Sequence, residues 1–363
     1  MTGKRKKHWL IVGIPVFLLY VFAAAQPIPV ETVLRARWLT SLESNYPIVM
    51  EETPRTGGET SPLPFRVGNR FGYLDEDGRF SINKVRSGYI SMSETSWAEY
   101  GAAPEQIEIF DPLNKPLLTL TDPQGYPLFL DDRIFLVGKE QNSITALDGN
   151  GNESWRYDFS APLSCIDAAA GLVLTGSLDG VVELLDSSGR LVFAPFEPGG
   201  SRLAVILGCA LSRDGSRFAV VSGIDDQRFL LLEKSADAYR VIYHEFLTDG
   251  FRRPVYLSYT YTGRRGVFDR EGGLGLYDID NRTSVFLPME GEIAALDGAG
   301  SDNLLFIISS LGEDAKKLAA VSFPGRIILE APFKSASAFL SRRGNRIYVG
   351  GDSSMVSFEL FMK

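Results

Sequence analysis

The residue types that most catalytic sites need are scarce in this chain of 363 residues. It contains two histidines and two cysteines, and His8 lies in a basic N-terminal stretch. A Ser-His-Asp or Cys-His site would therefore depend on His244, and sites with several histidine ligands are excluded. His244 and Glu245 are neighbours in an alternating apolar stretch, so their side chains point to opposite faces of the predicted strand. We interpret His244 as a hydrogen-bonded structural histidine and predict no catalytic residue.

Two segments approach the pattern of a metal or nucleotide loop but lack required residues. Asp148, Asn150 and Asn152 alternate as in a Ca²⁺ loop. However, Glu153 stands where the turn glycine is required, so we interpret this segment as a hairpin turn. Residues 272–275, Gly-Gly-Leu-Gly, lack the strand–helix context of a dinucleotide loop. The sequence therefore predicts no metal site and no cofactor.

Arginine pairs are the first candidates for contacts with a protein partner. The formal net charge is -8, from 37 basic and 45 acidic residues, which argues against a nucleic-acid-binding surface. Residues 65–363 contain a repeat of about 41 residues, and within this acidic chain Arg252-Arg253 and Arg264-Arg265 fall in a single unit of it. We predict that they form a cationic patch that binds carboxylates of a partner. Ordinary solvated turns are the alternative.

A long aromatic loop is the second candidate for a partner contact. Residues 93–105 exceed the usual length of a loop in this repeat and contain Trp97 and Tyr100. Exposed aromatic residues on loops are typical of binding surfaces. We predict that both side chains are exposed and contact the partner.

The N-terminal 25 residues have the composition of an export signal. Positions 4–7 are basic, and the uncharged apolar run at 10–25 has 16 residues, fewer than the about 20 of a membrane-spanning helix. It ends in three alanines, which fits signal-peptidase cleavage after Ala25. The alternative is an uncleaved membrane anchor through residues 9–25. Either predicts a periplasmic or other extracytoplasmic location.

The next segment, residues 26–64, is expected to join this signal to the main domain. Apolar residues from Val30 to Leu42 share one helical face, which predicts a short amphipathic helix. Residues 51–64 are rich in Pro, Gly and Thr, as in a flexible linker.

Residues 65–363 consist of short alternating apolar runs separated by Gly, Asp and Asn turns. Similar strand ends recur at positions 111, 148, 186, 233, 278, 322 and 359, on average every about 41 residues, the period of a four-stranded β-propeller blade. One unit is predicted in full, with strands at 126–130, 133–139, 143–147 and 154–159. Six units span 79–333, and a strand near 65–75 is expected to complete a seventh with residues 335–362. Counting Leu74-Asp75 as a separate unit gives eight blades.

Several of these units resemble known propeller families. Residues 144–148, followed by Gly151 and Trp155, are similar to quinoprotein-like (PQQ-like) repeats, and residues 212–215 to WD40-like or YVTN-like exported propellers. The resemblance implies an all-β propeller. The adjacent cysteines of quinone-binding dehydrogenases are missing, so the resemblance does not extend to redox activity. The nearest analogue that it implies is a non-enzymatic envelope scaffold that assists outer-membrane protein assembly.

The two cysteines occupy similar positions in successive repeats. Cys165 and Cys209 are 44 residues apart. Equivalent positions on neighbouring repeats are usually separated by more than the about 7 Å that a disulfide spans. We predict two buried free thiols, with a disulfide as the alternative.

The sequence as a whole predicts a binding module. We expect a non-catalytic, exported or membrane-tethered propeller that serves as an interaction or assembly platform in the cell envelope. The alternatives are a quinoprotein-like or glycan-processing enzyme, or a small-ligand sensor, with the site in the central funnel.

Overall fold

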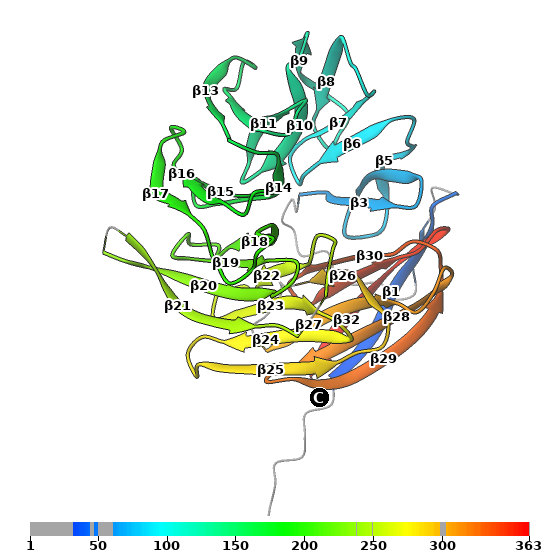
Figure 1. The fold of residues 1–363 in the computed structure, drawn as a ribbon. Helices are drawn as coiled ribbons and strands as arrows, with labels where there is room; N and C mark the ends of the chain where they lie inside the picture. Colours follow the sequence, from blue (N-terminus) through cyan, green and yellow to red (C-terminus); the bar gives the residue numbers. More distant parts are fainter. Residues whose placement is uncertain are drawn as a thin grey trace, which may run out of the picture. The chain divides into compact units, whose positions relative to one another are not determined.

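The computed structural model describes residues 32–43, 47–49, 61–236, 238–248, 250–297 and 303–362. Over these ranges the chain forms strands and turns, with no helix long and apolar enough to cross a membrane. The predicted signal or anchor at residues 1–25 and most of the predicted linker lie outside them. The strands form eight antiparallel sheets (Figure 1). The predicted all-β propeller is therefore confirmed.

Six sheets have four strands each, paired in chain order. The first three are β6–β9 (Tyr89–Met92, Trp97–Tyr100, Gln106–Phe110, Pro116–Thr121), β10–β13 (Gly125–Leu130, Arg133–Gly138, Ser143–Leu147, Glu153–Asp158) and β14–β17 (Leu163–Ala169, Leu172–Ser177, Val182–Leu185, Leu191–Phe196). The next three are β18–β21 (Ile206–Leu211, Arg217–Ser222, Arg228–Ser235, Ala238–Phe246), β22–β25 (Leu257–Tyr259, Arg265–Arg270, Gly273–Asp278, Thr283–Pro288) and β26–β29 (Glu292–Asp297, Leu304–Ser310, Ala315–Ser322, Arg326–Lys334). The six predicted repeat units are thus confirmed, but the first begins at residue 89 and not at 79, because residues 80–85 belong to another sheet.

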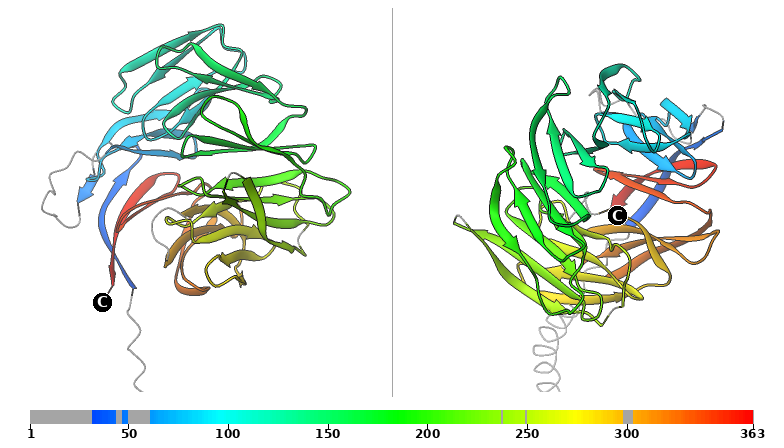
Figure 2. Two further views of the ribbon diagram at one scale, coloured as in Figure 1. Left: turned by 90° about the vertical axis from the view of Figure 1, so that its left-hand side faces the viewer. Right: turned by 45° about the horizontal axis from the view of Figure 1, so that its top comes forward.

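The first and last described strands of the chain meet in a five-stranded sheet. Its order is β2 (Pro47–Val49), β1 (Thr32–Ser41), β32 (Ser354–Met362), β31 (Arg346–Gly350) and β30 (Phe339–Arg343). Figure 2 shows β1 in blue beside β32 in red.

The prediction of an amphipathic helix over residues 30–42 is wrong, because residues 32–41 of this segment form β1. Trp38, Thr40 and Leu42 are all buried, at the two-residue spacing of a strand. The guanidinium of Arg37 also pairs with the carboxylate of Glu359 on β32. Pairing with the far end of the chain therefore overrides the helical period of the apolar residues.

The prediction of seven blades is also wrong, and the alternative of eight is correct. Residues 65–75 do not complete the last sheet, since β1 holds that position. They belong instead to a separate three-stranded sheet, β3 (Leu63–Val67), β4 (Arg70–Leu74) and β5 (Phe80–Val85). The turn at Asp75 between β4 and β5 matches the turns at Asp111 and Asp148, because each carboxylate accepts backbone N–H groups two and four residues ahead.

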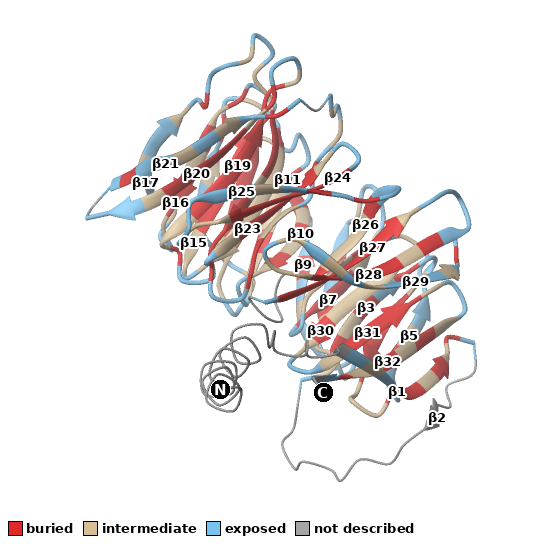
Figure 3. Ribbon diagram, turned by 90° about the horizontal axis from the view of Figure 1, so that it is seen from below, coloured by how far each residue is buried: buried red, intermediate tan, exposed pale blue. Residues whose placement is uncertain are grey.

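The first strands of successive sheets contact one another, as in β14 with β18 and β18 with β22. The middle strands carry the core, with Phe218, Phe229 and Phe268 among the fully buried side chains. Figure 3 shows this as red middle strands and pale-blue outer strands such as β17 and β21.

Two tryptophans join neighbouring sheets in the same way. The Trp155 indole N–H donates to the carbonyl of Ser187 at 2.9 Å, and its ring lies against Gly189, which has a φ of 78°. A Cβ at Gly189 would lie 2.6 Å from this ring, so only glycine fits. Trp38 repeats the contact with the carbonyl of Glu76 and with Gly78.

Because the strands alternate in direction, their connections fall on two faces. The hairpin face carries the turns between the first and second strands and between the third and fourth strands of each sheet. The linker face carries the turns between second and third strands and the connections from one sheet to the next. These two names are used below.

Candidate functional site

Trp97, predicted as an exposed contact residue, is part of the core. It lies at the start of β7 and is 2% exposed. Its indole N–H donates to the carbonyl of Asp111 at 3.0 Å, and its ring stacks on Phe110 with centroids 4.8 Å apart. The prediction of an exposed Trp97 is therefore wrong, since Trp97 lies in β7, which runs through the middle of residues 93–105.

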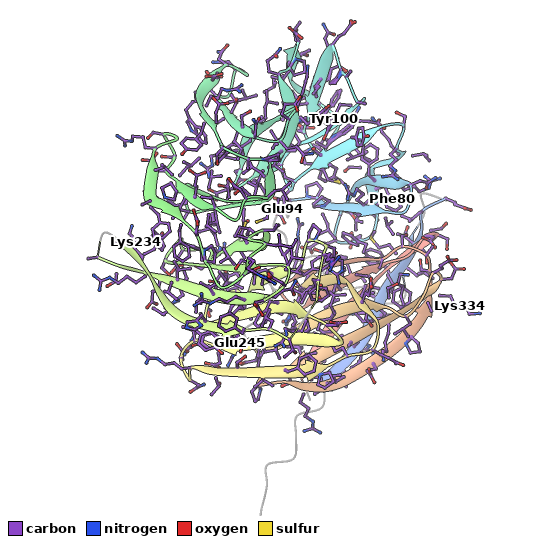
Figure 4. All side chains as sticks on the ribbon, viewed as in Figure 1. Phe80, Glu94, Tyr100, Lys234, Glu245 and Lys334 are labelled. Carbon is purple, nitrogen blue, oxygen red and sulfur yellow. The ribbon has the colours of Figure 1, made fainter. Side chains whose placement is uncertain are left out.

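Tyr100 lies at the opposite end of β7, on the linker face (Figure 4). Its ring is half-buried and stacks between the rings of Tyr89 and Tyr126, at centroid distances of 6.0 and 5.7 Å. Its hydroxyl lies 3.0 Å from that of Ser91. Tyr89 is the most exposed ring of the three. A partner contact through Tyr100 stays a prediction.

The structure separates the two arginine pairs. Arg264 and Arg265 lie at the start of β23 on the hairpin face, whereas Arg252 and Arg253 precede β22 on the linker face. The six residues of β23 extend about 20 Å between these faces. The four arginines therefore do not form the single patch that the sequence predicts.

The pair on the hairpin face is held by local acids. Arg264 pairs with Asp280 at 2.5 Å, and Arg265 pairs with Asp278 at 3.1 Å. Burial raises the pKa of Asp278, but hydrogen bonds from Asn281 and Arg265 outweigh it, so the pKa is lowered overall. These two arginines stabilise turns of their own sheet.

The pair on the linker face lines a pocket of about 410 Å³, which we call the arginine pocket. It is formed by residues 250–253, 269–272 and 291–292. The guanidinium of Arg253 pairs with Asp269 at 2.8 Å, and Asp269 is 2% exposed. The Arg253 guanidinium also lies over the ring of Phe251, 4.5 Å from its centroid. Arg253 is thus fixed in place by a buried acid and an aromatic ring.

Arg252 differs from its neighbour. Its side chain is exposed, and within the described part of the chain it makes no hydrogen bond or ion pair. Across the pocket, the Glu271 carboxylate accepts the N–H of Gly250 at 3.3 Å, and Arg270 lies over the exposed ring of Phe286. The pocket therefore presents a free guanidinium beside aromatic surface, which suits a carboxylate-bearing partner.

Sequence reasoning missed Phe251 and Asp269, which hold Arg253. Phe251 directly precedes the arginine pair, so its proximity was visible in the sequence. Asp269 is 16 residues away on β23 and reaches Arg253 only through the pairing of strands.

The remaining sequence candidates do not form reactive sites. Asp148 accepts the N–H groups of Asn150 and Asn152, as a hairpin turn requires. Glu245 accepts hydrogen bonds from Tyr243 and Ser284, on the side of the strand away from His244. The His244 side chain is exposed and makes no hydrogen bond to the described residues, so the prediction of a hydrogen-bonded structural histidine is wrong. No cluster of metal ligands occurs among the described residues.

The two cysteines are free thiols, as predicted, but both residues are half-buried instead of buried, and their thiols lie close together. Burial raises the pKa of the Cys209 thiol, and a hydrogen bond with the Cys165 thiol raises it further. The predicted separation therefore fails, because β14 and β18 lie side by side.

Comparisons with known proteins agree with this architecture. A family described as "beta-propeller protein" matches residues 1–362. A protein of Treponema pallidum (strain Nichols), described as uncharacterised, is 28% identical over 300 residues, which cover 82% of this chain and 79% of the relative. The solved structure titled "The crystal structure of BamB from Moraxella catarrhalis" covers 90% of this chain and 100% of its own, with a TM-score of 0.58. Its sequence is 12% identical, so this likeness concerns the fold alone.

Proposed function

Because this chain belongs to the beta-propeller protein family, we propose that it is a non-catalytic platform that binds a protein partner through its linker face. The propeller fold itself is compatible with many functions, so the residues of the linker face must support a specific one. Arg252, Phe251 and the half-buried Tyr100 are the contact residues of this proposal. No catalytic step is assigned to them.

The observation that carries the proposal is the contrast between Arg252 and Arg253. A buried acid and an aromatic ring hold Arg253 rigidly, so the adjacent Arg252 is presented from an ordered segment. A preorganised side chain loses little conformational entropy on binding, and arginines beside aromatic rings are frequent anchors of interfaces. The partner is expected to bring a carboxylate to Arg252 and an apolar group to Phe251.

We place this platform in the cell envelope. The support is the basic stretch followed by the apolar run in residues 1–25, together with the structural likeness to BamB. Fractionation of cells that express the full chain tests this location, and recovery in the cytosol contradicts it.

A site-specific photocrosslinker tests the binding face. Placed at position 252 of the full chain in cells, it is expected to trap a partner, and the crosslink is expected to weaken when Phe251→Ala is added. Position 264 is the matched control, because Arg264 is also an exposed arginine but lies on the hairpin face. Equal crosslinking at both positions, or none at 252, contradicts the proposal.

A further inference from the structure

A second and larger pocket opens on the hairpin face. It has a volume of about 650 Å³, within the range of small-molecule sites. It is formed by residues 166–169, 209–211 and 257–261, together with Asp131 and Arg213. These belong to β14, β18 and β22 and to the turns that follow β10, β18 and β22. We call it the tyrosine pocket.

Two hydroxyl groups in the wall of this pocket lack a partner. The hydroxyls of Tyr259 and Thr260 are enclosed and make no hydrogen bond, and the two residues are 7% and 2% exposed. Buried polar groups are nearly always hydrogen-bonded, and an exception calls for an explanation. Both oxygens have almost no accessible surface, so they lie behind the wall and mark a place where the protein does not complete its own hydrogen bonding.

The charges around the pocket balance. Asp131 and Asp167 provide two carboxylates, and Arg213 provides one guanidinium. The guanidinium of Arg133 pairs with Asp131 at 3.2 Å and neutralises it. Asp167 accepts the N–H groups of Ala168 and Leu211, and its second lone pairs stay available to a donor. An ionic ligand of either sign would meet a like charge in this pocket.

An aromatic platform stands at the mouth of the pocket. The ring of Tyr261 is 52% exposed, and the guanidinium of Arg213 lies 4.7 Å from its centroid. Within the described residues Arg213 has no acidic partner, so its donors are available. An exposed ring flanked by a guanidinium offers an apolar face with hydrogen-bond donors at its edge.

From these observations we propose that the tyrosine pocket binds an uncharged saccharide. Its hydroxyl groups would donate to Asp167 and Asp131 and accept from Arg213, and the apolar face of one sugar ring would lie on Tyr261. Hydroxyls both donate and accept, so one ligand type serves both the carboxylates and the guanidinium of the pocket. The site lies on the face opposite the arginine pocket, so this proposal and the proposed platform can fail separately.

Titration calorimetry on the full chain with maltose, cellobiose and N,N′-diacetylchitobiose tests the proposal. At least one of these uncharged disaccharides is expected to bind, with a Kd in the millimolar range or tighter. Tyr261→Ala and Arg213→Gln are each expected to weaken this binding by about tenfold. Tyr256→Ala is the matched control, because Tyr256 is an exposed tyrosine of the same sheet on the linker face.

Three outcomes overturn the proposal. The first is that none of the three disaccharides binds. The second is that Tyr261→Ala binds the disaccharide as tightly as the wild type does. The third is that Tyr256→Ala weakens binding as much as Tyr261→Ala does. A preference for a uronic-acid disaccharide or for a carboxylated quinone contradicts the uncharged class, because the carboxylates of the pocket would repel both. A circular-dichroism spectrum unchanged from the wild type shows that each variant is folded.

Discussion

The arginine pocket and the tyrosine pocket lie at opposite ends of the same sheet, β22–β25, and differ in how their polar groups are satisfied. In the arginine pocket, the buried carboxylate of Asp269 has its guanidinium within the protein. In the tyrosine pocket, the hydroxyls of Tyr259 and Thr260 have no partner within the protein. One pocket therefore pairs its buried charge and keeps a free cation at its rim, whereas the wall of the other leaves two buried hydroxyls without a hydrogen bond.

The largest effect is expected from removing the cation of the completed pocket. Arg253→Ala removes the guanidinium that pairs with the buried Asp269 carboxylate, which should destabilise the fold by about 2 kcal/mol, at the lower end for broken pairs because Arg253 is partly exposed. Chemical denaturation measures this loss. Arg213→Ala in the tyrosine pocket should change stability by less than about 0.5 kcal/mol. Equal losses of stability in the two variants would show that the two pockets do not differ in this respect.

The next largest effect is expected from substituting one contact residue in each pocket and measuring both binding activities. Arg252→Ala is expected to weaken partner binding by about tenfold and to leave disaccharide binding unchanged. Tyr261→Ala should do the reverse. Crosslinking yield, from a photocrosslinker at the exposed position 292 of the arginine pocket, and calorimetry on the same two variants measure both effects. A variant that lowers both readouts would indicate that the two faces are coupled.

A smaller effect on stability is expected from removing the unpartnered hydroxyl of Tyr259. Tyr259→Phe is expected to be neutral or stabilising by up to about 1 kcal/mol without sugar, because it deletes a buried polar atom with no hydrogen bond. Tyr243→Phe is the control, since its hydroxyl donates to Glu245 at 2.8 Å, and should cost about 1 kcal/mol. Thermal denaturation of both variants measures the difference. A clear loss of stability in Tyr259→Phe would imply a partner that satisfies this hydroxyl.

The smallest effect concerns the pH dependence of stability in the tyrosine pocket. Burial raises the pKa of Asp167, the nearby Asp131 adds to the rise, and hydrogen bonds from Leu211 and Ala168 oppose it. The folded state therefore binds this proton more tightly than the unfolded chain does. Stability should fall as the pH rises from the ordinary value of about 3.9 through the raised pKa. Denaturation across this range should show a weaker dependence in Asp167→Asn, and an unchanged slope would contradict the assignment.

Local sequence determined the repeat and most of its strands. The segments predicted at 126–130, 133–139, 143–147 and 154–159 match β10 to β13 within a residue. Alternating apolar residues and Asp-Gly turns act over a few residues, so they fix strands and hairpins without help from distant parts of the chain.

Tertiary structure decided which strands pair and which side chains are buried. The apolar residues near Trp38 fit either a helix or a strand, and β32, more than 300 residues away, selects the strand. Trp97 is buried because Phe110 and Phe71 pack on it from the next strand and the neighbouring sheet. The sequence places Arg253 beside Arg264, whereas the length of β23 separates them and brings Asp269 to Arg253. Side-chain types and local periods were set by the sequence alone, but burial and pairing depend on contacts between residues far apart in the chain, which no local pattern encodes.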